Sequence, residues 1–572
     1  MISHIINLCN QQQKMTVSSI KILKKKSLFL TNIQSFYMTD KSQLRSSIFR
    51  HLDGLAIAPV AIALKNNAVL EFILNKKQVQ LTELVNVFKA NEGYLNVGLR
   101  ILASQGFLDY EVNNQTQEIK ISVNEKTAIA FSLFYLYEDV VDLLQFSIQF
   151  HSRLFEDEPF EKLNIIFEKY KKNYGIKPSD DALINSIQDQ ILKHIEGYLI
   201  GPTIVRLAMK GMFHKYFMET SFKPEEFHKS PENFKKILDF FVHLGWFLEK
   251  KGNYQFTEDG LFFAKRASAY GVTVSYLPTF AKIEELIFGD PAALRMITDG
   301  ENEIHVDREM NVWGSGGAHD TYFKVVDEII VKLFNLPIEE QPKGILDMGC
   351  GNGAFLQHIF EVIDRQTLRG KMLDEYPLFL VGADYNQAAL KVTRANLIKA
   401  DIWAKVIWGD IGRPDLLSDD LKENYDIDLK DLLNVRTFLD HNRIWTDPKH
   451  IDKDRISKSS GAFAYRGKRI SNNLVEDNLL EHLQKWSPYV RKFGLLLIEL
   501  HTINPKLAAG NLGKTPATAY DATHGFSDQY IVEIDVFNNV AAEAGLFPDK
   551  SIFKRFPDAD IATVSINLLK GH

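Results

Sequence analysis

Cysteine, long apolar runs and positive net charge are scarce in this sequence, and each shortage excludes a class of protein. Only two of the 572 residues are cysteines, Cys9 and Cys350, so a disulfide framework is excluded and a reducing, cytoplasmic setting is expected. No uninterrupted apolar run reaches the roughly 20 residues of a membrane-spanning helix, so we expect no membrane partner. The formal net charge of −6 gives the chain no general attraction to nucleic acid.

Acidic residues are absent from the first 39 positions, where every charged side chain is a lysine. Acid-poor leaders of this kind include targeting segments, but this one lacks arginine and a long apolar core. We therefore expect residues 1–40 to be a disordered tail, or to lie upstream of the true start of translation. Met38 is then the candidate start, because ordered-looking sequence follows it directly.

The most informative stretch is 344–356, where an apolar segment runs into three glycines at alternate positions and then into a helical pattern. This order predicts a strand, a tight turn and a helix. Glycine permits backbone angles that a Cβ forbids, and the following helix presents free N–H groups at the same point. A nucleotide-like ligand is therefore expected here. The glycines are Gly349, Gly351 and Gly353.

Three acidic residues indicate which nucleotide is bound. Asp347 precedes the first glycine, where a carboxylate favours a cationic ligand and would repel a pyrophosphate. Asp384 ends a second predicted strand, 379–384, where a carboxylate can accept both ribose hydroxyls. Asp410 ends a third, 404–410, beside the expected adenine edge. A dinucleotide oxidoreductase or an empty Rossmann-like domain is the alternative.

In these motifs and their spacing, the chain from residue 342 to its end resembles the class I S-adenosylmethionine-dependent methyltransferases. The resemblance implies an α/β Rossmann-like, seven-stranded methyltransferase domain at 301–572 with S-adenosylmethionine as cofactor. It assigns Asp347 and the three glycines to the first motif, Asp384 to the ribose and Asp410 to the adenine. Further strands are expected at 432–439 and 493–501, with a closing antiparallel pair at 551–556 and 561–569.

The sequence ahead of residue 301 predicts a mainly helical region with winged-helix-like modules. Three helical stretches precede two short strands around the polar turn 113–115, and a weaker copy of this pattern turns at 251–253. The predicted segments are a winged-helix-like lid or dimerisation module at 41–125, a helical linker layer at 126–198 and a second winged-helix-like module at 199–300.

Winged helices either bind DNA or pack beside small-molecule methyltransferase domains as a lid or dimerisation layer. The first would-be recognition helix offers only Arg100, and the second mainly Lys235 and Lys236. Useful affinity for DNA needs several phosphate contacts. We therefore expect no nucleic-acid partner, and a homodimer if the first module serves dimerisation.

Three polar stretches are predicted to be loops. Residues 305–320, rich in glycine and containing Trp313, are expected to form a lid or a hinge within a lid-type lead-in at 301–335. Residues 446–472 are expected to be an insertion that forms a mobile loop over the site, and 520–530 a dense polar loop.

Acidic, imidazole and amide side chains follow the later strands, where ligands of parallel sheets bind. His441 and His524 are the candidate catalytic residues. A lone histidine can act as the general base of an O- or N-methyltransferase. Several imidazole and oxygen donors together can instead hold a metal, which would acidify the carbon of a 1,3-dicarbonyl. The group consists of Asp440, His441, His501, His524 and Gln529.

The segments 305–308, 313–316, 439–443 and 524–530 resemble the metal-dependent polyketide C-methyltransferases of the apratoxin-initiating type. This resemblance implies His441 and Gln529 as ligands of iron or manganese, with His524 a neighbour or an alternative ligand. It also implies an acyl or malonyl-type substrate. We see no condensing or carrier module around the domain, so we expect the substrate either to be presented by a separate carrier protein or to be a free acid or another activated acyl compound.

Two alternatives to this C-methyltransferase reading stay open. The first is a metal-free small-molecule O- or N-methyltransferase with His441 as base. The second is a regulator whose winged helices respond to S-adenosylmethionine. Cys350, inside the glycine turn, is expected to be a packing residue and not a nucleophile.

Overall fold

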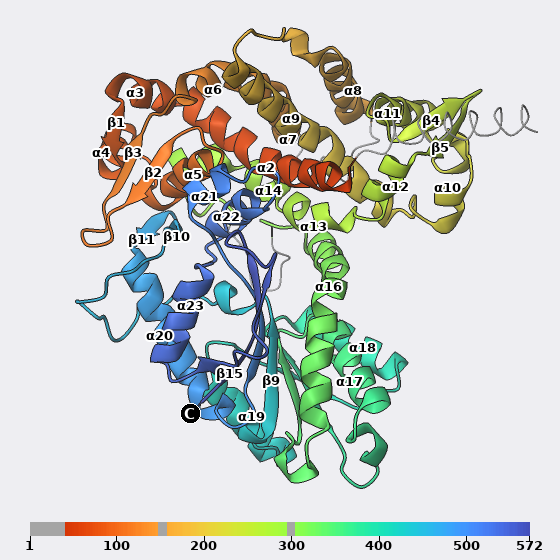
Figure 1. The fold of residues 1–572 in the computed structure, drawn as a ribbon, viewed down its shortest axis with the longest axis vertical. Helices are drawn as coiled ribbons and strands as arrows, with labels where there is room; N and C mark the ends of the chain where they lie inside the picture. The colour runs from red at the N-terminus through yellow and green to blue at the C-terminus, as the bar shows by residue number, and fades with distance from the viewer. Residues whose placement is uncertain (1–39, 147–156, 295–303, 572) are drawn as a thin grey trace, which may run out of the picture. The chain divides into compact units, whose positions relative to one another are not determined.

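The computed structural model describes residues 40–146, 157–294 and 304–571, so the tail predicted at 1–40 lies outside it except for Asp40. The chain divides into two compact units, whose elements are labelled in Figure 1. The smaller unit holds the described residues up to Arg45 together with 213–265. The larger unit holds 46–212 and 266 onward, and it contains every residue of the predicted site.

The smaller unit is built on one amphipathic helix and a hairpin. Helix α11 (Pro231–His243) buries apolar side chains along one face. Strands β4 (Phe247–Lys250) and β5 (Asn253–Phe256) pair antiparallel across a two-residue turn, Lys251 and Gly252, in which both φ angles are positive. Positive φ at both positions is the geometry that keeps a tight hairpin aligned with strand twist. The predicted hairpin is confirmed. Helices α10 (Lys215–Glu219) and α12 (Glu258–Ala264) complete the unit.

The larger unit begins with helices and a small sheet. The three strands pair in the order β1-β3-β2, so helices and a hairpin follow one another as the sequence predicts. Its elements are α2 (Lys41–Asn66), α3 (Val69–Lys76), β1 (Gln78–Gln80), α4 (Leu81–Phe88), α5 (Glu92–Ser104), β2 (Asp109–Val112), β3 (Ile119–Ser122), α6 (Thr127–Leu133), α7 (Glu138–Phe146), α8 (Asp157–Lys171), α9 (Ala182–Met209), α13 (Ser268–Ser275), α14 (Leu277–Phe280) and α15 (Ile283–Phe288).

Helix α2 is long and apolar enough to cross a membrane by length and composition, but 83% of its most apolar window is buried inside the protein. Its apolar character is explained by contact with other helices. Gly54 of α2 faces α9 so closely that a Cβ would lie 2.3 Å from the carbonyl oxygen of His194. Gly197 of α9 makes the reciprocal approach to His51, so α2 and α9 touch backbone to backbone.

The C-terminal α/β domain is one mixed sheet of eight strands in the order β13-β15-β12-β9-β6-β7-β8, with β14 also paired to β15. Strands β8, β7, β6, β9 and β12 are parallel, and β15 runs antiparallel to β12. The strands are β6 (Gly344–Met348), β7 (Phe379–Asp384), β8 (Lys405–Trp408), β9 (Leu432–Thr437), β12 (Leu495–Leu500), β13 (Phe547–Pro548), β14 (Lys554–Phe556) and β15 (Val564–Lys570).

This sheet confirms the predicted fold class, with one difference in the strand count. The edge strand next to β15 is broken into β13 and β14 by the intervening residues 549–553. Both fragments pair with β15, which makes eight strands where seven are expected. The predicted strands of the parallel core and the closing antiparallel pair are all present.

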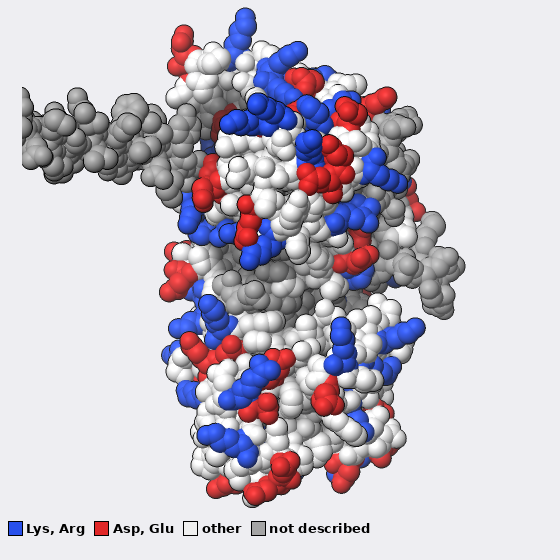
Figure 2. Space-filling model, turned by 90° about the vertical axis from the view of Figure 1, so that its right-hand side faces the viewer, with Lys and Arg blue, Asp and Glu red and all other residues white. Residues whose placement is uncertain are grey.

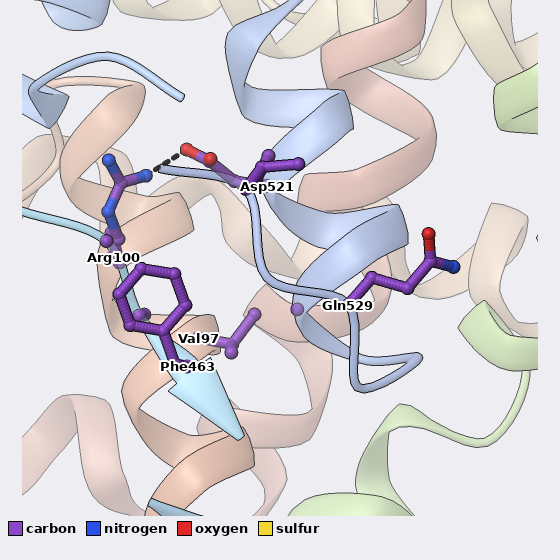
Figure 3. Close-up of a pocket in the computed structure, with 9 residues that line it drawn as sticks. Val97, Arg100, Phe463, Asp521 and Gln529 are labelled. Atoms are coloured by element: carbon purple, nitrogen blue, oxygen red, sulfur yellow. Dashed lines mark hydrogen bonds and ion pairs between the residues drawn. The ribbon is translucent and has the colours of Figure 1, made fainter. Parts of the chain in front are cut away.

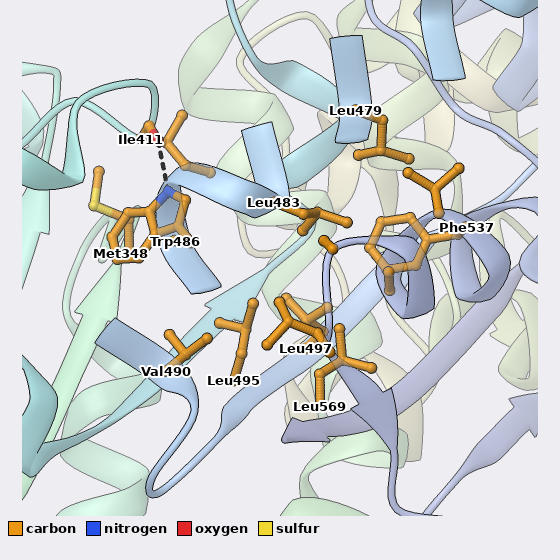
Figure 4. Close-up of a cluster of buried hydrophobic side chains, with 14 of the residues drawn as sticks. Met348, Ile411, Leu479, Leu483, Trp486, Val490, Leu495, Leu497, Phe537 and Leu569 are labelled. Carbon is orange, nitrogen blue, oxygen red and sulfur yellow. Dashed lines mark hydrogen bonds between the residues drawn. The ribbon is translucent and has the colours of Figure 1, made fainter. Parts of the chain in front are cut away.

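Two layers of helices cover the sheet (Figure 1). One face packs against α16 (Arg308–Phe334), α17 (Ala354–Gln366) and α18 (Gln387–Lys399). The other packs against α19 (Pro414–Tyr425), α20 (Asn472–Val490) and α23 (Ile534–Glu543). Figure 4 shows the second core, in which the fully buried Trp486 lies near Met348 and donates its indole N–H to the carbonyl of Ile411 at 2.7 Å.

The predicted glycine-rich loop at 305–320 is wrong, because α16 already begins at Arg308. Asp307 caps the helix by accepting a hydrogen bond from the N–H of Met310 at 3.0 Å. Gly314 serves helix packing, because a Cβ on Gly271 of α13 would lie 2.5 Å from its Cα. Close contact between α13 and α16 therefore explains the glycine at this position, whereas a Cβ on Gly316 would meet nothing within 4 Å.

The other two predicted loops also contain regular structure. Residues 520–525 belong to helix α22 (Ala517–Gly525), so the loop prediction for 520–530 is wrong over its first half. Within the insertion 446–472, strands β10 (Phe463–Tyr465) and β11 (Lys468–Ile470) form a hairpin. Gly467 of this hairpin accepts a hydrogen bond from the N–H of Gly93 in α5, at 2.8 Å.

Helix α5, the would-be recognition helix, packs against elements of the α/β domain. It packs against α21 (Pro505–Ala509), α22 and the β10–β11 hairpin. Arg100 of α5 forms a buried ion pair with Asp521 and donates to the carbonyl of Ile503 at 2.6 Å. Arg100 is thus engaged inside the protein. On the face shown in Figure 2, basic and acidic side chains are interspersed among the residues that the figure colours.

Breaking the Arg100–Asp521 pair on one side should destabilise the protein more than replacing both partners. Arg100→Met leaves a buried carboxylate without its cation, and we expect it to lower the free energy of unfolding by about 3–5 kcal/mol. The double variant Arg100→Met/Asp521→Leu should recover most of that loss. Urea unfolding followed by tryptophan fluorescence measures both. Equal losses in the single and the double variant would contradict the prediction.

Candidate functional site

The glycine turn after β6 is held in a conformation that only glycine adopts readily. The φ angles of Gly349, Gly351 and Gly353 are 80°, 56° and 79°, all in the left-handed region. A Cβ on Gly349 would also lie 2.9 Å from the side chain of Leu439. The turn curls over the end of β7, because the N–H groups of residues 349 and 350 both donate to the carbonyl of Ala383, at 2.8 and 3.1 Å.

Asp384 connects this turn to the end of β7. One carboxylate oxygen accepts a hydrogen bond from the N–H of Gly351 at 3.0 Å, and the other accepts from Asn386 at 2.8 Å. The next strand joins the same edge, because Gly409 donates to the carbonyl of Asp384 at 3.1 Å, directly before Asp410. The structure therefore brings the predicted ribose and adenine acids to neighbouring strand ends beside the glycine turn.

Asp347 is buried at 2% exposure, and its Oδ2 has no hydrogen-bond partner among the described residues. Burial, reinforced by the charge of Asp384, raises the pKa of Asp347 to about 7. A buried carboxylate with an unused oxygen beside a glycine turn fits a ligand that brings a cationic group. S-adenosylmethionine has an ammonium and a sulfonium, so these residues suit the predicted donor.

Cys350, within the turn, behaves as a packing residue. Burial raises the pKa of its thiol to about 12, so it stays protonated at neutral pH. Its sulfur lies 3.6 Å from the hydroxyl of Thr393. A protonated, buried thiol is not a nucleophile.

The raised pKa of Asp347 predicts a pH-dependent affinity for the donor. A cationic ligand needs the carboxylate, which loses its charge as the pH falls through about 7, so S-adenosylmethionine should bind about tenfold more weakly at pH 6 than at pH 8. Asp347→Asn should bind weakly at both pH values. Isothermal titration calorimetry measures this, with the Asn variant accounting for the ligand's own titration.

The same variant should be more stable than the wild type when no ligand is present. A carboxyl whose pKa is raised on folding destabilises the folded state as the pH rises from about 4 to 7. At pH 8 we expect Asp347→Asn to unfold with a free energy about 1–3 kcal/mol higher. A less stable variant at pH 8 would show that Asp347 is held by a favourable contact.

His441 lies directly beyond β9 and is oriented by Glu499 at the end of β12. Its Nδ1 is 2.5 Å from one carboxylate oxygen of Glu499, and the other oxygen accepts from the N–H of Asp440 at 2.9 Å. The carboxylate therefore fixes the imidazole tautomer with the proton on Nδ1. This leaves Nε2 with a lone pair for a proton or a metal ion.

His524 of α22 faces His441, with their ring centroids 4.9 Å apart. Its Nδ1 donates to the carbonyl of Tyr520 at 2.7 Å, which again leaves Nε2 with a lone pair. Burial, reinforced by the proximity of His441, lowers the pKa of His524 to about 3. A neutral imidazole is suited to accept a hydrogen bond or to ligate a metal, and unsuited to act as a charged acid.

Gln529 joins the two histidines through the backbone and presents an amide. Its N–H donates to the carbonyl of His524 at 2.9 Å, and the next N–H, of Tyr530, donates to the carbonyl of His441 at 2.8 Å. The side-chain nitrogen donates to Ser527 and to Tyr276, at 2.8 and 3.0 Å. The amide oxygen is therefore the atom left for a ligand.

The three atoms left for a ligand are of the chemical types that bind the predicted metal. Two imidazole nitrogens and one amide oxygen are donors that iron and manganese accept, and each imidazole has its second nitrogen held by an oxygen acceptor, as ligating histidines do. Among the described residues no cluster of three or more His, Cys, Asp or Glu could hold a metal. The amide of Gln529 is thus needed to complete a three-donor set.

Two other predicted site residues are structural. His501 is fully enclosed and uses both ring nitrogens, on the carbonyl of Val532 at 3.0 Å and the hydroxyl of Ser565 at 2.8 Å. Burial lowers its pKa to about 4. Asp440 is buried between Arg436 and His482, at 2.5 and 2.9 Å. Although burial opposes it, the charge of Arg436 holds the pKa of Asp440 well below its usual range.

Sequence reasoning missed the roles of the supporting residues around this edge. Arg436, whose guanidinium lies 3.9 Å from the ring centroid of Trp486, was visible only as a charge inside an apolar strand. Its burial in the sheet requires a carboxylate partner nearby, and that signal could have identified Asp440 as its partner. His482 and Tyr276 come from distant segments, and the sequence contains no local signal that connects them to the site.

Comparison with protein-family models matches three successive stretches of the chain. These are the AprA N-terminal domain at residues 44–110, the AprA winged helix domain at 196–290 and the AprA MT2-like domain at 303–567. Together they cover most of the sequence in order. No curated protein sequence matches the chain.

Three of the solved structures similar to this chain are described as methyltransferases. The mitomycin 7-O-methyltransferase MmcR is 11% identical with a TM-score of 0.39, over 68% of this chain and 98% of that one. CalO1, a methyltransferase in calicheamicin biosynthesis in its SAH-bound form, is 13% identical with a TM-score of 0.38, over 69% and 100%. The CurJ carbon methyltransferase is 11% identical with a TM-score of 0.31, over 76% and 100%.

Proposed function

The chain belongs to the AprA-type class I S-adenosylmethionine-dependent methyltransferases, and we propose that it methylates carbon in an acyl or malonyl-type substrate with the help of iron or manganese. One observation carries this proposal. His441, His524 and Gln529 each have one polar atom held by a neighbour and a second, ligating atom left over, and the three residues adjoin.

In this proposal His441 and Gln529 hold the metal, with His524 as a third donor. When bound, the metal withdraws electron density from two carbonyl oxygens and so acidifies the carbon between them. Glu499 orients His441 and increases the basicity of its Nε2. The glycine turn, with Asp347, Asp384 and Asp410, holds the donor at the same edge of the sheet, so that the methyl group faces the acceptor carbon.

A metal-free O- or N-methyltransferase is the second candidate, and the His441–Glu499 pair favours it. A carboxylate 2.5 Å from Nδ1 is also what a general-base histidine requires, because it stabilises the imidazolium formed when Nε2 takes a proton. Here His441 would remove the proton of a hydroxyl or amine, and Gln529 would only bind the substrate.

Metal analysis separates the two candidates. Purified protein should contain iron or manganese, and labelled S-adenosylmethionine should transfer its methyl group to free or carrier-bound malonyl-type acids, detected by mass shift. Chelation should abolish that transfer, and added manganese should restore it. Full activity in chelator, with product methylated on oxygen or nitrogen, would establish the metal-free candidate.

Removing the imidazole of His441 should abolish turnover while leaving donor binding intact. We expect His441→Ala to lose at least about 1000-fold in kcat, because the same group serves as ligand or base. Its dissociation constant for S-adenosylhomocysteine should change less than threefold, because the glycine turn is untouched. The exposed His450, in the insertion, is the matched control. Normal methylation by His441→Ala would remove this residue from the chemistry.

A further inference from the structure

Residues of the N-terminal helical region form an ion pair and hydrogen bonds with the chain segment that supplies His524 and Gln529. Three side chains of residues 521–529 are held by residues of this region, which are more than 200 positions away in sequence. Asp521 pairs with Arg100, Asp528 accepts from the hydroxyl of Tyr94 at 2.8 Å, and Gln529 donates to Tyr276 at 3.0 Å. The contacts therefore lie at both ends of the segment.

These contacts come from two different elements of the helical region. Figure 3 shows Asp521 directed at Arg100 and the side chain of Gln529 directed away from it, with a narrow cavity lined by Val97 and Phe463 beside them. Helix α5 and α22 are in close contact, since a Cβ on Gly525 would lie 2.7 Å from Val97. The segment is thus clamped between α5 and the residues that end α13.

Ser527 and Tyr276 together hold the amide of Gln529, whose nitrogen donates to both hydroxyl oxygens. The Ser527 hydroxyl already donates to the carbonyl of Thr523 at 2.6 Å, so it can only accept from Gln529, and turning the amide over would cost this hydrogen bond. Asp528, the residue before Gln529, has a φ of 58°. This left-handed conformation is unfavourable in free energy for a residue with a side chain. Tyr94 stabilises that conformation through its bond to the Asp528 carboxylate.

We infer that Tyr276, together with Arg100 and Tyr94, is a positioning residue, and that the helical region completes the acceptor site by aiming the oxygen of Gln529. This inference rests on the proposed metal-binding function. It assigns the helical region a direct part in site geometry, whereas the donor side is built from the α/β domain alone.

The test compares Tyr276→Phe with Tyr198→Phe in the full chain. Both replacements remove one buried hydroxyl that makes a hydrogen bond, but the Tyr198 hydroxyl bonds the carbonyl of Leu55, inside the helical region. Mn²⁺ affinity is measured by electron paramagnetic resonance of the free ion, S-adenosylhomocysteine affinity by calorimetry, and melting temperature by circular dichroism.

Tyr276→Phe should bind Mn²⁺ roughly tenfold more weakly, as expected when an outer partner of a ligand is lost. Its affinity for S-adenosylhomocysteine should stay within twofold of wild type, and its melting temperature should match that of Tyr198→Phe. Tyr198→Phe should bind Mn²⁺ like the wild type. A merely structural tyrosine would lower the melting temperature and leave the Mn²⁺ affinity unchanged.

Two negative outcomes have different meanings. If the wild type binds Mn²⁺ and Tyr276→Phe binds it equally well, the positioning role is overturned while the proposed function stands. If the wild type binds neither Mn²⁺ nor Fe²⁺, the metal-assisted function fails, and the positioning role toward a metal fails with it.

Discussion

Glu499 is the residue whose contacts hold the acceptor side of the proposed site together. It lies at the end of β12. One of its carboxylate oxygens accepts a hydrogen bond from the imidazole of His441, and the other accepts from the main-chain N–H of Asp440. One side chain thereby connects the ends of two neighbouring parallel strands. A carboxylate at 2% exposure is tolerated only because both of its oxygens accept hydrogen bonds. The orientation of His441, and through it the spacing to His524, follows from this connection.

The two sides of the proposed site have different structural origins. The donor side consists of a glycine turn and strand ends of a single sheet, so local backbone geometry suffices to form it. The acceptor side depends in addition on contacts from the helical region, which hold the segment that supplies His524 and Gln529. Arg100 is the clearest case, since it also donates to the carbonyl of Ile503 and the hydroxyl of Thr502. A helix of winged-helix type serves here as a packing and positioning element.

The sequence was sufficient to predict the fold class, the strands of the parallel core and the glycine turn, while the donor-binding roles of Asp347, Asp384 and Asp410 stay predictions. These depend on short-range patterns: apolar runs, alternate glycines and acids at strand ends. It was insufficient where composition has two physical explanations. Gly314 and its neighbours suggested a loop, but Gly314 lies inside α16 and lets it touch α13. Asp521 and His524 face Arg100 and His441 from inside helix α22, and their polarity alone suggested a loop. Tyr276 was unpredictable, because only the tertiary fold brings it to Gln529.

The broken edge of the sheet bears on how the protein associates with other chains. Strand addition, whether in aggregation or in a shared sheet between subunits, needs a continuous row of unpaired backbone N–H and C=O groups. On one side that row is interrupted where β13 gives way to β14, and on the other it is limited to the four residues of β8. Neither edge of the sheet therefore presents a long row of unpaired backbone groups to another chain. Strand addition at the borders of this sheet is therefore disfavoured, which leaves the strand ends of the proposed site free of intermolecular pairing.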